Sequence, residues 1–370
     1  MNTNIDSLEF KFLDVPEFGH ALEVYEGVFW ARIPMPWVLD HINIYFFKET
    51  NGWTVVDTGP KTKKSIDVWE ALDKNLLKGE PVVRVLATHM HPDHVGMAGW
   101  ICEKYGSEFL MTKGELNQVR LLWATSDGKT PQYEVDFLLR GGLSKEKVEK
   151  SSKEGGWKLS DVVYEIPMPY TRLMDQMIIT LGGRRWRVIE GRGHSPEHAC
   201  LECMDAPLFI AGDQVLGRIT ANVSVNASEP NGNPLAHWIV SLNRMHAVAE
   251  DPLVLPSHDG LYTGLHCRLD ELVHGHLRKC ERLLDHCVEP KNVVETFPSL
   301  YRRKIKGLDF HLGLGEAVSH LRLMESIGAI KRDSSADVDL YQTIEKVDDA
   351  EIIKRVNALD YVQMAHLPSL

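Results

Sequence analysis

Short runs of hydrophobic residues predict a chain that begins as β structure. Residues 41–48 and 53–57 are two such runs, separated by Asn51-Gly52, a dipeptide that strongly favours a hairpin turn. Similar runs predict further strands over 81–88, 108–111, 176–181, 185–189, 207–212 and 252–256. Helical spacing predicts helices over 61–77, 95–105 and 234–248. Strands and helices in this mixed order indicate a layered α/β domain.

Two segments depart from that pattern. Residues 113–170 lose the strand periodicity and contain amphipathic helical pieces, so we expect a helical lid whose candidate apolar walls are Trp123, Tyr133, Phe137 and Tyr170. From residue 265 the pattern is almost entirely helical, with helices expected over 265–287, 294–303 and 309–326 and a β-hairpin over 328–341. We therefore expect a main domain over 1–265, a mostly helical domain over 266–345 and a tail over 346–370.

Composition narrows the class of protein. The 370 residues are 44% hydrophobic and 25% charged, which is typical of a globular protein with a sizeable core. The net charge of −11 counts against nucleic-acid binding. No stretch approaches the roughly 18 apolar residues of a membrane span, the N-terminus lacks the features of a secretory signal, and six cysteines are too few for a disulfide scaffold. We expect a cytoplasmic protein with reduced thiols.

Residues that carry chemistry are concentrated directly after the strand predicted over 81–88. Residues 88–94 read Thr-His-Met-His-Pro-Asp-His, with three histidines and one aspartate in six residues. Packing does not explain this cluster, whereas neutral imidazole is a common zinc ligand. His89 and His91 lie two apart in an extended segment and point to the same side. Asp93 and His94 lie beyond the bend at Pro92 and can face a second point.

Further ligand types stand at the ends of three other predicted strands. His194 follows the strand over 185–189, Asp213 follows 207–212 and His258 follows 252–256. Layered α/β proteins gather their chemistry at the carboxyl ends of strands. These residues are therefore candidates to complete the metal shells that a six-residue motif cannot fill.

Over residues 20–260, the order of these motifs resembles the metallo-β-lactamase superfamily. The motifs are HxHxDH, then GHSxxH, then an aspartate after glycine and a late histidine after serine. Asp57 matches the structural aspartate that precedes the metal loop in that superfamily. The resemblance implies an αββα sandwich with the metals at one edge of its sheets. It also implies two zinc ions per chain, with iron or manganese as alternatives. One ion would be held by His89, His91 and His194, the other by Asp93, His94 and His258, with Asp213 as the bridge.

The implied mechanism follows from the ions. Two zinc ions about 3.5–4 Å apart would share a water, lower its pKa towards ~7 and supply hydroxide that attacks a polarised carbonyl or phosphorus. Asp93 is the candidate catalytic residue that orients the nucleophile and takes up a proton. All seven ligand positions are filled, which argues against the mononuclear dioxygenases and diiron reductases of the superfamily.

Other conspicuous residues favour structural roles. We interpret His198 as a hydrogen-bond partner or surface residue, Cys200 and Cys203 as buried thiols, and Asp57 as a tie between loops. Three further histidines follow His258 on the expected long helix, where a helix surface is the favoured position: His266, His274 and His276. Tyr262 and Arg192 flank ligand histidines, and substrate contact is the less favoured reading for both.

The residues after 265 resemble the winged-helix C-terminal domain of one subgroup, whose members include thioester hydrolases and RNA-cleaving enzymes. Leu216 stands where lactonases of the superfamily have a tyrosine, which counts against a lactonase. Asp259-Gly260 does not match the aromatic and basic substrate contacts that glutathione-thioester hydrolases have beside the last histidine. Secreted antibiotic hydrolases lack a bridging aspartate, so Asp213 counts against that class. We therefore expect hydrolysis of a small-molecule acyl substrate, a thioester or ester. The alternative is a metal-dependent nuclease or phosphodiesterase, and a third hypothesis is a regulatory protein without catalysis.

The expected helical domain has no basic character. Residues 266–345 hold 12 Lys or Arg and 13 Asp or Glu, and the helix expected over 309–326 offers Arg322 as its one permanent cation. Such a surface gains little from releasing counterions of nucleic acid. We therefore expect neither a nucleic-acid partner nor a membrane partner, with a homo-oligomer left open.

Overall fold

The fold is built around two mixed β-sheets. The computed structural model describes residues 8–12, 14–153, 156, 158–248, 251–305 and 307–359. Within these residues the first sheet has the strand order β2 (Ala21–Tyr25), β3 (Val28–Pro34), β4 (His41–Glu49), β5 (Gly52–Val56), β6 (Val82–Leu86), β7 (Glu108–Thr112) and β8 (Thr171–Leu173). The second has the order β1 (Glu9–Phe10), β14 (Tyr262–Thr263), β13 (Leu253–Pro256), β12 (Leu208–Gly212), β11 (His198–Cys203), β10 (Arg184–Gly191) and β9 (Ile178–Leu181).

Strand β4 shows how the sequence sets the layers. Side chains alternate along a strand, so Ile42, Ile44 and Phe46 pack with the helices on the outer face of the first sheet. Tyr45 and Phe47 point the other way and pack against the second sheet. Both faces of the strand are buried, which is why its sequence reads as a continuous hydrophobic run.

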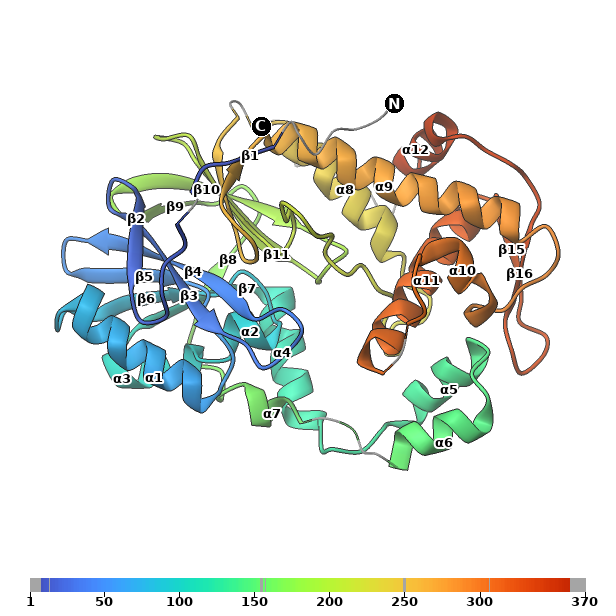
Figure 1. The fold of residues 1–370 in the computed structure, drawn as a ribbon, viewed down its shortest axis with the longest axis horizontal. Helices are drawn as coiled ribbons and strands as arrows, with labels where there is room; N and C mark the ends of the chain where they lie inside the picture. The colour runs from blue at the N-terminus through green and yellow to red at the C-terminus, as the bar shows by residue number, and fades with distance from the viewer. Residues whose placement is uncertain are drawn as a thin grey trace.

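Helices cover the outer face of each sheet (Figure 1). Against the first sheet lie α1 (Lys63–Leu72) with a π-helical turn Asp73–Leu77, α3 (Ala98–Tyr105), α4 (Lys113–Thr125) and α7 (Leu159–Val162). Against the second lie α8 (Pro234–Met245) and α9 (Leu265–His286). The described hydrophobic core accordingly forms one cluster between the sheets and one on each outer face. The expected αββα sandwich is confirmed.

The predicted insertion over 113–170 does not stand apart as one lid. Leu116 and Val119 of α4 and Val163 beyond α7 belong to the core against the first sheet, because their spacing gives each short helix one apolar face. The helices α5 (Gln132–Arg140) and α6 (Lys145–Lys153) leave the sandwich and lie on the C-terminal side of the molecule (Figure 1). The backbone N–H of Val294 donates to the carbonyl of Gly141 at 3.1 Å, which ties this part to the C-terminal region.

The C-terminal region is helical, with one hairpin among its described residues. It contains α9, a 3-10 turn Val294–Thr296, α10 (Phe297–Leu300), α11 (Leu308–Ser326), the antiparallel pair β15 (Ile330–Asp333) and β16 (Leu340–Thr343), and α12 (Asp349–Asn357). The likeness to a winged helix stays a prediction from the sequence. Within the described ranges, no helix is both long and apolar enough to cross a membrane.

Helix α12 lies in the segment that we expected to be a tail. The side chain of Asp348 caps it by accepting a hydrogen bond from the backbone N–H of Glu351 at 2.9 Å. Ile352 and Val356 are buried and join the core of the C-terminal region. The expected tail therefore contains a packed helix over part of its length, and residues 360–370 lie outside the described ranges.

Candidate metal centre

The histidine-rich loop begins where β6 ends. His91 has an extended backbone and precedes the short helix α2 (Pro92–Val95), whose first position is occupied by Pro92. Proline is favoured at this position because its missing N–H has no helical partner there. The turn separates the side chains before it from Asp93 and His94, which lie in the first turn of the helix. The local sequence thus directs two sets of ligands to two places.

The first set gathers around His89. Its Nε2 lies 2.8 Å from Nδ1 of His91 and 3.3 Å from Nε2 of His194. The Nε2 of His194 also lies 3.5 Å from a carboxylate oxygen of Asp213. One ligand atom from each of these four residues lies within 4.8 Å of the others. Four residues from three separate segments of the chain therefore converge on one point.

The second set consists of Asp93, His94 and His258. The Nε2 of His258 lies 3.4 Å from Asp93 Oδ2, and the Nε2 of His94 lies 3.5 Å from the same oxygen. Asp213 reaches this set as well, because its carboxylate oxygens lie 3.5 Å from Nε2 of His94 and 3.5 Å from Nε2 of His258. All seven predicted ligands are thus brought together, in the two groups that the resemblance implied, with Asp213 touching both.

Partners on the far ring nitrogens hold three of these imidazoles in place. Nδ1 of His94 lies 2.8 Å from a carboxylate oxygen of Asp57, Nδ1 of His194 lies 2.8 Å from the carbonyl of Asn222, and Nδ1 of His258 lies 3.0 Å from a backbone carbonyl. Each acceptor fixes the proton on Nδ1, so the lone pair on Nε2 faces the cluster. Metal-binding histidines are oriented in this way. Asp57 is the tie between loops that the sequence indicated.

Electrostatics differ between the two groups when no ion is bound. Burial, together with neighbouring imidazoles, lowers the pKa of His91 to about 3 and that of His89 well below its usual value. Burial also opposes charge on His94 and His258, but nearby carboxylates outweigh it, raising the pKa of His258 to about 9 and that of His94 well above its usual value. His89 and His91 are therefore neutral at pH 7, whereas His94 and His258 hold protons that a cation would displace.

Two buried polar atoms of the cluster have no hydrogen-bond partner among the described residues. Nε2 of His94 and Oδ1 of Asp213 are buried, and neither makes a hydrogen bond with any residue of the described ranges. Buried polar atoms are nearly always satisfied. A divalent cation would complete both atoms, and nitrogen and oxygen ligands are those that zinc takes in proteins. The residues present fit a metal centre.

Glu115, in the first turn of α4, is a residue that the sequence reasoning did not identify. One carboxylate oxygen accepts from the backbone N–H of Met90 at 2.9 Å, and the other accepts from the Ser195 hydroxyl at 2.6 Å and the Glu197 N–H at 2.7 Å. Burial raises the pKa of Glu115 to about 7, although these donors favour its charged form. Glu115 therefore joins the two loops that carry His91 and His194.

His198 holds the backbone of Asp213 in place. Its Nε2 accepts a hydrogen bond from the backbone N–H of Asp213 at 3.1 Å, and its ring is fully buried. Gly212 lies so close to this ring that a Cβ there would come within 2.4 Å of Nε2. Tyr262, in contrast, is buried in the core with its hydroxyl on the carbonyl of Val215, which rules out the substrate contact considered for it.

Residues 222–225 connect the C-terminal region to the metal cluster. The carbonyl of Asn222 receives Nδ1 of His194, and three residues later the N–H of Val225 donates to the carbonyl of Gly315 in α11 at 3.1 Å. The Ser224 hydroxyl donates to the side-chain oxygen of Asn222 at 2.5 Å, and its oxygen lies 3.2 Å from the carbonyl oxygen of Leu312. Helix α11 therefore holds the segment that orients a candidate ligand.

Comparisons with known proteins agree with this geometry. The model of the metallo-beta-lactamase superfamily matches residues 37–258, and that of the metallo-beta-lactamase-like C-terminal domain matches residues 280–344. The chain is similar to a beta-lactamase domain protein from Burkholderia ambifaria, at 35% identity over 92% of this chain and 99% of that chain, with a TM-score of 0.84. A metallo-beta-lactamase family protein from Thermus thermophilus shares the fold, at 24% identity over 86% of this chain and 99% of that chain, with a TM-score of 0.72.

The family model covers more than half of the chain, and the similarity to the Burkholderia protein extends over nearly all of it. The His and Asp groups described above can hold divalent metal. The chain belongs to the metallo-beta-lactamase superfamily and is a metal-dependent hydrolase.

Proposed function

We propose that this chain is a dinuclear zinc hydrolase that cleaves an acyl substrate, a thioester or an ester. The observation that carries the proposal is the position of Asp213, whose carboxylate oxygens lie 3.5 Å from Nε2 of His194, His94 and His258. A carboxylate with contacts on both sides is suited to bridge two ions. Two zinc ions held there would share a water and lower its pKa towards ~7, which supplies a nucleophile at neutral pH.

Asp93 is the residue placed to handle the proton. Burial alone would raise the pKa of its carboxyl, but the charge on His94 and the hydrogen bond with His258 lower that pKa well below its usual range. The carboxylate is therefore ionised and can orient a nucleophile in the cluster by accepting a hydrogen bond from it. We propose that it also takes up the proton once bound ions replace the His94 and His258 protons that lower its pKa, since a general base works best with a pKa near the working pH.

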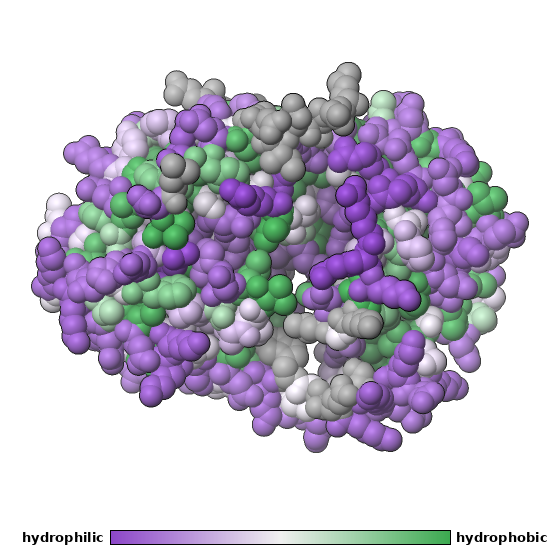
Figure 2. Space-filling view, in the orientation of Figure 1, coloured by the Kyte–Doolittle hydropathy of each residue, from purple (hydrophilic) through white to green (hydrophobic). Residues whose placement is uncertain are grey.

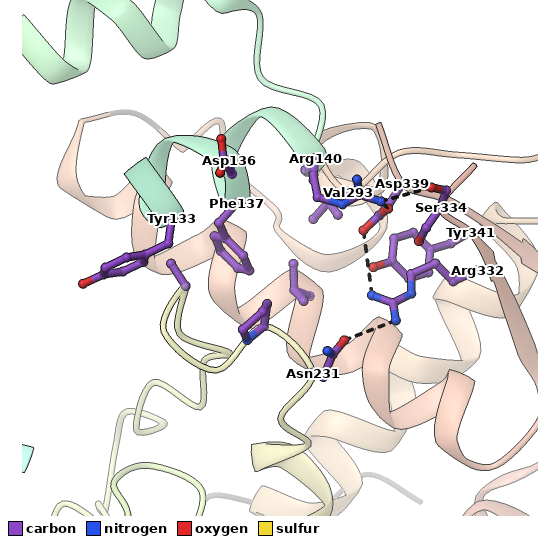
Figure 3. A pocket seen from close by; sticks show the side chains of 14 residues that line it. Tyr133, Asp136, Phe137, Arg140, Asn231, Val293, Arg332, Ser334, Asp339 and Tyr341 are labelled. Atoms are coloured by element: carbon purple, nitrogen blue, oxygen red, sulfur yellow. Dashed lines mark hydrogen bonds and ion pairs between the residues drawn. The ribbon is translucent and has the colours of Figure 1, made fainter. Parts of the chain in front are cut away.

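A partly apolar pocket on the C-terminal side supports an acyl substrate. Figure 2 shows a hollow between the two halves of the molecule, with hydrophobic side chains along its edge. A pocket of about 390 Å³ has a mixed lining (Figure 3). One part is apolar, with Tyr133, Phe137, Val318 and Ala227, and another is charged, with Arg140 and Arg332 paired to Asp339. Ala227 follows within a few residues of Asn222, whose carbonyl receives His194. Trp123 and Tyr170 pack against the first sheet instead, so the four predicted walls do not meet.

Two features support this class of substrate over others in the superfamily. Leu216, at the position where lactonases have a tyrosine, is buried in the core and offers no hydroxyl. In α11, Leu314, Leu321 and Met324 are fully buried, and Arg322 pairs with Glu325. A helix committed in this way to packing has little surface left for nucleic acid.

The proposal is tested by one substrate screen with zinc content measured on the same sample. The set comprises acyl-CoA thioesters of several chain lengths, simple esters, lactones, phosphodiesters and RNA. We expect the highest kcat/KM for a thioester or ester, with activity lost on chelation and restored by zinc. Cleavage of RNA or phosphodiesters without cleavage of any acyl compound would contradict the proposal and support the nuclease alternative.

A further inference from the structure

A second group of histidines lies in the C-terminal region, away from the catalytic cluster in sequence. His276 of α9 and His320 of α11 are both buried, with relative exposures of 1% and 0%. The sequence suggested that His276 lies on a helix surface, which is wrong, because α11 and Trp238 of α8 cover that side of α9. His266 and His274 are only half-buried. Glu316, one turn before His320, completes the group.

The three side chains point at one another. Nδ1 of His276 lies 2.9 Å from Nε2 of His320, and one ligand atom from each residue, including a Glu316 carboxylate oxygen, lies within 4.8 Å of the others. Burial, with a smaller contribution from nearby charges, lowers the pKa of His320 to about 4 and that of His276 well below its usual value. Both imidazoles are therefore neutral and present lone pairs at pH 7.

Outer partners orient these side chains as they do at metal sites. Nδ1 of His320 lies 2.7 Å from the backbone carbonyl of Glu316, which fixes the proton there and leaves the lone pair of Nε2 facing His276. Lys279 binds one carboxylate oxygen of Glu316 at 2.6 Å and leaves the other oxygen available. The side chains of Lys279 and Glu316 are 23% and 16% exposed, which provides a route from solvent.

A pair of neutral imidazoles does not satisfy this group by itself. Because Nε2 of His320 carries no proton, His276 must donate from Nδ1, and its own Nε2 is then a bare lone pair. That atom is buried and makes no hydrogen bond with any described residue, and the same holds for the indole N–H of Trp238 beside it. A cation in place of the shared proton would use both facing lone pairs, and the proton of His276 would move to Nε2. Because Nε2 has no described partner in either state, the case for an ion rests on the two facing nitrogen atoms and the Glu316 carboxylate.

We propose that His276, His320 and Glu316 form a further binding site for a divalent transition metal, with Zn²⁺ as the best match to two imidazoles and one carboxylate. The ion links α9 to α11 and has a structural role. Helix α11 also carries Gly315, whose carbonyl accepts a hydrogen bond from Val225. Val225 lies in the same segment as Asn222, whose carbonyl orients His194. The site therefore stabilises the position of α11, the helix that holds this segment.

The test is a zinc count on the full chain. Protein stripped with a chelator is saturated with Zn²⁺, passed through gel filtration and analysed for bound metal. We expect wild type to retain one ion per chain more than Glu316→Gln and His276→Gln. Glu325→Gln on α11 and His274→Gln on α9 are matched controls that should keep the wild-type count.

Equal zinc in wild type and in both site variants would overturn the proposal. A second measurement needs no variant and is unaffected by a folding defect: anomalous diffraction at the zinc edge from crystals of zinc-saturated wild type. A peak between Nδ1 of His276 and Nε2 of His320 is expected, and its absence would equally overturn the site. Neither result depends on the catalytic centre, whose ions lie on other residues.

Discussion

Buried histidines gather in two regions of this protein, and the regions differ in what surrounds them. At the metal centre, His94 lies among the carboxylates of Asp57, Asp93 and Asp213, which outweigh burial and raise its pKa. In the C-terminal group, His276 faces His320 and no carboxylate outweighs burial, so its pKa falls. Burial alone thus makes histidine neutral, as it does for His91 within the metal centre itself, and a histidine holds a proton only where the neighbouring carboxylates outweigh burial.

Removal of the bridging carboxylate should have the largest effect. We expect Asp213→Ala to lose more activity than the roughly 10–100-fold that loss of an outer partner of a metal ligand costs, because this carboxylate contacts both groups. The measurement is kcat/KM with zinc content on the same sample. His198→Gln is the comparison, since it disturbs Asp213 only through a backbone N–H. Equal losses in the two variants would show that Asp213 does not bridge.

Acid should affect stability through the C-terminal histidines. The pKa of His320 is about 4 in the folded chain and about 6.5 in the unfolded chain. Between these values only the unfolded state binds the proton, so this contribution to stability is present above pH 6.5 and is lost as the pH falls towards 4. The loss is about 3 kcal/mol from this residue at the shift given.

The measurement is urea unfolding of chelator-treated wild type and His320→Gln at pH 7.5 and pH 4.5. The destabilisation caused by His320→Gln should shrink at the lower pH, because the variant lacks the group that the unfolded chain protonates. A destabilisation that is the same at both values of pH would contradict the neutral state assigned to His320. This result would remove the contrast between the two histidine regions.

Gly315 tests the connection between the regions. A Cβ at this position would lie 2.9 Å from the Cβ of Ser224 and 2.9 Å from the carbonyl oxygen of Val225. Gly315→Ala should therefore displace the segment that orients His194 and destabilise the chain by about 1–3 kcal/mol, as overpacking does. Zinc affinity should fall with it. Gly275→Ala on α9 is the control, since its Cβ would meet nothing within 4 Å; similar zinc affinities in the two variants would argue against the connection.

The smallest expected effect concerns the pocket between α5 and the C-terminal region. Phe137→Ala enlarges a cavity that we propose for an acyl chain, so kcat/KM should shift towards longer or bulkier acyl groups while zinc content stays the same. Trp123 packs against the first sheet and does not line this pocket, so Trp123→Ala should leave the preference for acyl chain length unchanged. Identical chain-length profiles for wild type and Phe137→Ala would mean that the pocket does not receive the substrate.

The convergence of the seven candidate ligands was predictable because each segment that carries them follows a strand, where the motif and the strand pattern are both local. The role of Glu115 was not, since its partners Met90 and Ser195 lie 25 and 80 positions away in the chain. His276 was misplaced for the same reason. An amphipathic helix shows which residues share a face, but the burial of His276 depends on α11, whose docking no local pattern reveals.

Continuous hydrophobic runs such as β4 predicted the strands of a layered α/β domain, and the resemblance implied the αββα sandwich, whereas the insertion over 113–170 was read too simply. Loss of strand periodicity correctly indicated helices, but it does not tell which surface each helix covers. Leu116 and Val119 pack on the first sheet, and Leu138 packs with the C-terminal core. The capping pair Asp348 and Glu351 was visible in the sequence and would have indicated α12.

The central claim is that Asp213 bridges two zinc ions at the catalytic centre. Anomalous diffraction at the zinc edge from zinc-loaded crystals tests it most directly, because it locates each ion independently of activity. The account predicts two peaks about 3.5–4 Å apart, one beside His89, His91 and His194 and the other beside His94 and His258, with Asp213 between them. A single peak at this centre, or two peaks without contact to Asp213, would contradict it.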